Sequence, residues 1–105
     1  MNNDDLMERF QKTLMIAIRN DAILMVMDTL VRIAELLIEK QEQERAVEIL
    51  VFIFQYPMRP ETHLRAEALY LDLEAGLPPR VIQDAKTLAN ELTLDDLLEA
   101  IVNKR

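Results

Sequence analysis

The sequence predicts an all-α fold of about six helices in a single domain covering residues 1–105. Glycine occurs once and proline four times among the 105 residues, so the residues that build tight β-turns are scarce. Half of the residues are apolar, and many recur at intervals of three and four, the spacing of one helix face. A chain of this length can bury one hydrophobic core.

The first two helices are predicted over about residues 4–18 and 21–40. In the first, one face carries the apolar residues Leu6, Phe10, Leu14 and Ala17, and Asn3 is its candidate N-cap. The second is apolar except for one polar stripe, which comprises Asp28, Arg32, Glu35 and Glu39. Such a helix is typically packed on two flanks, so we expect it at the centre of the bundle. Its charged residues argue against a transmembrane span.

The third helix is predicted to follow a polar break at residues 41–44 and to run to about Tyr56. Residues 49–54 are entirely apolar and taken alone could form a buried strand. A lone strand would have no pairing partner in this chain, so a helix is favoured. The prolines Pro57 and Pro60 then predict a rigid connection, because each fixes its own φ and disfavours helix at the preceding residue.

Three further helices are predicted over about residues 60–76, 80–91 and from Thr93 onward. Pro60 suits the first turn of a helix, and Pro78 and Pro79 enforce a bend before the fifth. Residues 93–96 resemble a capping box with aspartate in place of glutamate. In this last helix acidic residues near the start and Lys104 and Arg105 at the end complement the helix dipole.

Residues 21–57 resemble a hairpin of the tetratricopeptide-repeat family. In that family the first helix carries large apolar residues followed by a small one. The second helix carries a small residue and then an apolar one, and a proline follows near its end. The corresponding positions here are Leu30, Ile33, Ala34, Ala46, Leu50 and Pro57. Small side chains at Ala34 and Ala46 would let the two helices approach closely. The resemblance implies antiparallel helical hairpins that bind other proteins.

The match departs from the family pattern at three places. Leu37 stands at the usual aromatic position, Ile53 stands at a usual small position, and residues 41–43 replace a usual glycine. The longer segment 30–102 resembles the C-terminal helical end of large bacterial regulators, which join helical repeats to signal-transduction ATPase, kinase or transcription-factor domains. This second resemblance implies that residues 60–104 form capping helices and that the role is regulatory or scaffolding in a bacterium.

Composition argues against several classes of function. The net charge of −7 disfavours binding to nucleic acid or to an anionic membrane. The absence of cysteine fits a cytoplasmic location, and the acidic, polar residues 1–5 do not resemble a signal peptide. His63 is the only histidine and serine is absent, so a two-histidine metal site and a serine triad cannot be built. We expect no enzyme, no cofactor and no metal site.

The sequence therefore predicts a non-enzymatic protein–protein interaction module whose partner it does not identify. The resemblance implies a binding groove along the second helix, at Asp28, Val31, Arg32, Glu35, Ile38 and Glu39. The simpler alternative is a solvated face in which Asp28 and Arg32 form an ion pair within the helix. The alternative function is a structural homodimer without a groove ligand, which would bury excess apolar surface of the third and first helices, with Phe52 and Phe54 as the candidate residues.

Overall fold

The computed structural model describes the backbone of residues 3–103 and the side chains of residues 4–102. The predicted all-α class is confirmed, because this part of the chain forms six helices and contains no strand. The helices are α1 (Asn3–Arg19), α2 (Ile23–Glu39), α3 (Gln43–Ile53), α4 (Pro60–Gly76), α5 (Pro79–Glu91) and α6 (Leu94–Asn103). No helix among the described residues has the length and apolar character needed to cross a membrane.

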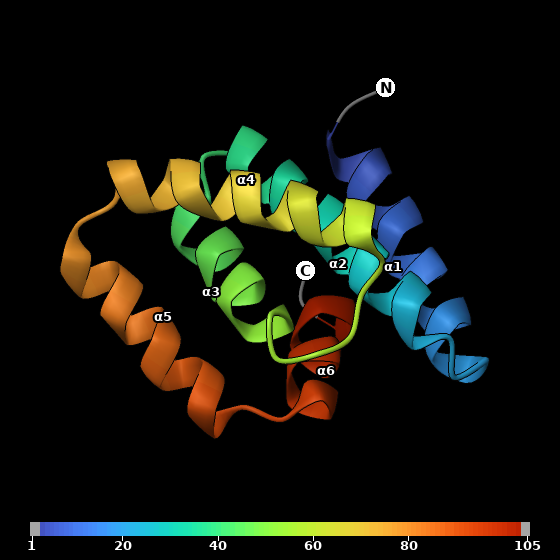
Figure 1. The fold of residues 1–105 in the computed structure, drawn as a ribbon. Coiled ribbons are helices and arrows are strands. Elements are labelled where there is room, and N and C mark those ends of the chain that lie inside the picture. The colour runs from blue at the N-terminus through green and yellow to red at the C-terminus, as the bar shows by residue number, and fades with distance from the viewer. Residues whose placement is uncertain (1–2, 104–105) are drawn as a thin grey trace.

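Helix α2 lies at the centre of the bundle, as its nearly all-round apolar character predicts (Figure 1). It packs against α1, α3 and α4, while α3 also packs against α4 and α5, and α6 packs against α1. Ala34 on α2 and Ala46 on α3 are both 0% exposed, in keeping with a close approach of these two helices. The closer resemblance to a tetratricopeptide-repeat hairpin stays a prediction, because helical hairpins occur in many folds.

The α1–α2 and α2–α3 turns share one geometry, a Schellman motif. Asp21 and Gln41 adopt left-handed φ values of 53° and 67°. The amide of Ala22 donates to the Ala17 carbonyl at 2.9 Å, and the amide of Glu42 donates to the Leu37 carbonyl at 2.8 Å. Gln41 thus occupies the conformation that glycine adopts most easily.

Replacing Gln41 by glycine is therefore expected to raise the free energy of unfolding, by roughly 0.5–1 kcal/mol. Glycine removes the steric penalty of the left-handed conformation, and the extra freedom of the unfolded chain offsets part of this gain. Urea denaturation measures the difference. The matched control is Gln83→Gly inside α5, which should lower the same free energy by roughly 0.5–1 kcal/mol. A loss of stability in Gln41→Gly would show that the side chain contributes more than its backbone strain.

The start of α6 confirms the predicted capping box. The amide of Asp96 donates to Thr93 Oγ1 at 3.1 Å, and the amide of Thr93 donates to Asp96 Oδ2 at 3.3 Å. Pro60 and Pro79 lie in the first turns of α4 and α5, where proline is common in helices.

The predictions for the Asn3 side chain and for Lys104 and Arg105 concern parts of the chain outside those that the structure describes.

Helix α3 ends three residues earlier than predicted, at Ile53 rather than near Tyr56. The strand alternative for residues 49–54 is wrong, since this run is helical through Ile53. Residues 54–56 form a turn in which the Tyr56 amide donates to the Ile53 carbonyl at 3.0 Å. The physical reason is Pro57, which disfavours helical conformation at the residue before it.

Candidate functional site

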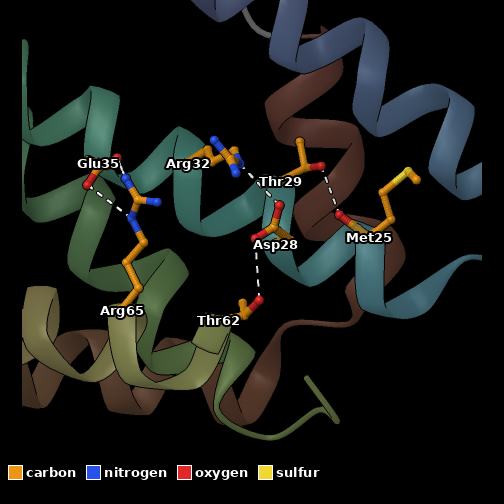
Figure 2. A network of polar contacts seen from close by, with 7 residues as sticks. All are labelled: Met25, Asp28, Thr29, Arg32, Glu35, Thr62 and Arg65. Atoms are coloured by element: carbon orange, nitrogen blue, oxygen red, sulfur yellow. Dashed lines mark hydrogen bonds and ion pairs between the residues drawn. The ribbon is translucent and has the colours of Figure 1, made fainter. Parts of the chain in front are cut away.

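The predicted groove along α2 is covered in part by α4, through polar contacts shown in Figure 2. Glu35 accepts two bonds from Arg65 of α4, one from Nη2 at 2.6 Å and one from Nε at 3.2 Å. Asp28 accepts one bond from Thr62 Oγ1 at 3.3 Å and one from Arg32 Nε at 3.1 Å. Thr62 is buried although α4 is otherwise largely exposed. Two carboxylates of the stripe thus hold α4 against α2.

The remaining groove residues divide between surface and core. Arg32 and Glu39 are exposed, and Ile38 is half-buried. Val31 is only 1% exposed, so its predicted place on a binding surface is wrong. The physical reason is that α2 packs against α1, α3 and α4, and Val31 lies on a part of its surface that these contacts bury. Binding of a partner by Arg32 and Glu39 stays a prediction.

The two residues of the predicted self-association surface are Phe52 in α3 and Phe54 just after it, and they are buried and half-buried within the chain. Phe52 is 1% exposed, and its ring lies 5.3 Å from that of Tyr56. Phe54 is half-buried, with its ring 5.6 Å from His63 and 5.9 Å from Tyr70, both on α4. Helices α4 and α5 both pack against α3. Phe52 therefore offers no surface for a homodimer.

A different apolar surface remains uncovered, between α1 and α6. Two adjoining pockets of about 270 and 210 Å³ lie there and share Ile18 and Leu98. We call the two pockets together the α1–α6 groove. Its apolar lining consists of Met15, Ala17, Ile18, Ile23, Val26, Leu94, Leu98 and Val102. Met15 and Ile18 are 39% and 36% exposed, and they line the same pocket as Leu98 and Val102, so the exposed apolar surface is contiguous there.

Charged side chains surround the α1–α6 groove. Arg19 and Glu99 line the larger pocket, and Asp21 and Asp95 line the smaller one. An apolar floor with charged residues at its edge is the usual anatomy of a protein-binding site.

Sequence reasoning missed this groove because its two walls are far apart along the chain. Met15 and Leu98 are separated by more than eighty positions, and no local pattern links them. The sequence of α1 nevertheless contains a sign of an additional apolar surface. Three of its apolar residues lie outside the predicted apolar face, and α2 cannot cover both surfaces; these residues are Met15, Ile16 and Ile18.

A larger hollow of about 660 Å³ lies between the α2–α3 and α4–α5 turns. Most of the residues that line it are polar or charged, and they include Glu42, which pairs with Arg45 at 2.7 Å and with Lys40 outside the hollow at 3.7 Å. Its apolar lining consists of Leu77, Pro78 and Val81, fewer apolar residues than line the α1–α6 groove. Size alone therefore does not make this hollow the better candidate.

Tyr70 and His63 are the two titratable ring side chains of α4. Burial raises the pKa of Tyr70, and so does the Glu74 carboxylate to a smaller extent. The Tyr70 hydroxyl donates a hydrogen bond to Glu74 Oε2 at 2.8 Å. His63 is exposed and rests against Phe54. Within residues 4–102 no three histidine or carboxylate side chains are grouped in a way that could hold a metal ion.

Comparisons with known proteins add no relatives. No family model, no curated protein and no solved structure matches the chain. The surface chemistry of the described residues is therefore the basis for a functional proposal.

Proposed function

We propose that this chain is a non-enzymatic helical module that binds another protein through the α1–α6 groove. The observation that carries the proposal is the exposure of Met15 and Ile18 beside Leu98 and Val102 in one continuous depression. Leaving large apolar side chains in water is unfavourable, and such patches on small soluble proteins commonly mark interaction sites. Flexible methionine side chains adapt well to the shape of a partner.

The biological setting is proposed from resemblance alone. The similarity of residues 30–102 to the helical end of bacterial regulators supports a regulatory or scaffold role in the bacterial cytoplasm. The partner would insert apolar side chains between α1 and α6 and would not use the groove along α2 that the resemblance implies. Arg32 and Glu39 would then form a solvent-exposed face of α2 without a binding role.

Self-association through the same groove is the second candidate. Arg19 and Glu99 line one pocket and carry opposite charges. Around a two-fold axis each arginine could face Glu99 of a second copy, which would place two ion pairs beside the apolar contact. The net charge of −7 opposes this arrangement because it repels a second copy at low salt.

The test is a double substitution, Met15→Gln with Ile18→Gln, compared with Ile16→Gln. Ile16 is 56% exposed on the same helix but does not line the groove, so it is a matched control. Tagged wild-type protein and both variants are used to capture partners from the native host, followed by mass spectrometry. The double variant should retain the partner at least about tenfold less well, since burying one apolar side chain contributes roughly 1.5–3 kcal/mol and about 1.4 kcal/mol already corresponds to a tenfold change.

Light scattering on the purified proteins separates the two candidates. A heterologous partner predicts the mass of one chain, 12.2 kDa, for the wild type. A homodimer predicts twice this mass for the wild type and the control, and a return to one chain in the double variant. Equal capture by all three proteins, with equal masses, would contradict the proposal. Circular dichroism confirms that the variants stay folded.

A further inference from the structure

The outer face of α4 carries a second apolar surface, separate from the α1–α6 groove. Leu64 and Leu71 are 66% and 54% exposed, and Ala68 and Ala75 are exposed between and beyond them. These four residues follow one another at intervals of four, three and four, which places them on one face of the helix. We call them the α4 stripe.

The α4 stripe lies on the side of the helix that faces away from the bundle. The opposite side of α4 is buried at Thr62, Ala66 and Leu73 and packs against α2 and α3. In Figure 1, α4 crosses these two helices at the edge of the molecule. Apolar residues therefore occupy both sides of α4, and the fold uses only one of them.

Acidic residues border the α4 stripe on both sides. Glu67 and Glu74, seven residues apart, lie along one edge, and Glu61 and Asp72, eleven residues apart, lie along the other. All four are exposed, and Glu74 also accepts the Tyr70 hydroxyl at 2.8 Å. Arg65 is drawn to α2 by its two bonds to Glu35. The border of the stripe is thus uniformly negative.

We infer that the α4 stripe docks an amphipathic helix of a partner protein that carries lysine or arginine on both sides of its own apolar face. Apolar residues spaced alternately three and four positions apart are typical of helix pairs whose side chains interlock along one line of contact. Charged residues on either side of that line determine which helix is bound. Alanine at two of the four positions allows a close approach of the second helix. The acidic border supplies complementary charge to a basic helix.

The same border disfavours other occupants. A second copy, docked parallel or antiparallel along the stripe, would place carboxylates against carboxylates, and like charges across an interface are unfavourable. The overall charge of −7 adds to this repulsion. An anionic membrane surface is repelled for the same reason. This inference does not depend on the α1–α6 groove, since none of the stripe residues lines either of its pockets.

The experiment uses two synthetic helical peptides of about three heptads with leucine and alanine along the seam. One has lysine at every flanking position and the other has glutamate. Fluorescence anisotropy measures the binding of each labelled peptide to the whole protein. We expect binding of the lysine peptide only, weakening with added salt.

Variants of α4 locate the binding and test its charge dependence. Glu67→Lys with Asp72→Lys should weaken the lysine peptide by about tenfold or more and should allow the glutamate peptide to bind. The matched control is Asp84→Lys with Glu91→Lys on α5, which changes the net charge equally and should have less than about a threefold effect. Leu64→Gln with Leu71→Gln leaves the charge unchanged and should abolish binding.

Four results would overturn the inference. These are no binding of the lysine peptide, equal binding of both peptides, equal weakening by the α4 and α5 charge variants, and undiminished binding to the Leu64→Gln, Leu71→Gln protein. The capture experiment tests the α1–α6 groove and the peptide experiment tests the α4 stripe. A negative result in the first would leave the peptide results unchanged, so each proposal can fail without the other. All the substituted residues are exposed, and thermal melting confirms that each variant is folded.

Discussion

Replacing Phe52 by alanine is expected to lower the free energy of unfolding by about 3–5 kcal/mol. Phe52 is 1% exposed and packs beside Tyr56, and α3 lies against α2, α4 and α5. Alanine would remove the buried ring and leave a cavity that the surrounding helices could fill only in part. Urea denaturation, fitted as a two-state transition, measures the change.

Phe54→Ala is the matched control for this substitution. Its ring is half-buried against His63 and Tyr70, so its removal should destabilise the protein less than Phe52→Ala does. The midpoint for Phe52→Ala should depend on protein concentration no more than that of the wild type does, because the ring packs inside one chain. A loss under about 1 kcal/mol, or a stronger concentration dependence than in the wild type, would contradict its place in the intrachain core.

Replacing Ala46 by leucine is expected to destabilise the protein by about 1–3 kcal/mol. Ala46 is 0% exposed on α3, which packs directly against α2. A larger side chain at this position must push the two helices apart or adopt an unfavourable rotamer. The free energy of unfolding in urea again gives the magnitude.

Ala100→Leu provides the comparison, since Ala100 is exposed on α6 and lines neither pocket of the α1–α6 groove. The same increase in volume extends into solvent there, and surface substitutions usually change stability by less than about 0.5 kcal/mol. If both variants change stability equally, the contact between α2 and α3 has room for a leucine. That result would count against a close approach of the two helices at Ala46.

Local patterns along the chain were sufficient to predict the helices and several of their ends. The interval of the apolar residues predicted the helical class, and Thr93 with Asp96 predicted the cap that starts α6. Pro60 and Pro79 stand where proline is favoured, in the first turns of α4 and α5. The end of α3 was placed three residues too late because the apolar run continues through Phe54, whereas the helix ends at Ile53 and a turn leads to Pro57.

The candidate surfaces could not be predicted in the same way. The groove along α2 is implied by the family resemblance, and nothing near Glu35 in the sequence indicates its contact with Arg65, thirty positions later. The burial of Phe52 was not predicted either, because α4 and α5, which pack against α3, follow it in the chain. Both cases depend on which helix covers which face.

Local patterns are enough to predict that this protein is helical, where most of its helices begin, and that other helices pack around α2. The packing of the helices was not predictable from those patterns: α4 crosses α2 and α3, α6 returns to α1, and Met15, Ile18, Leu64 and Leu71 stay in contact with water. Helix formation and capping depend on residues within about one turn, which lie together in the sequence. Burial depends on contacts between helices, and an apolar face is equally suited to the chain's own core and to a partner.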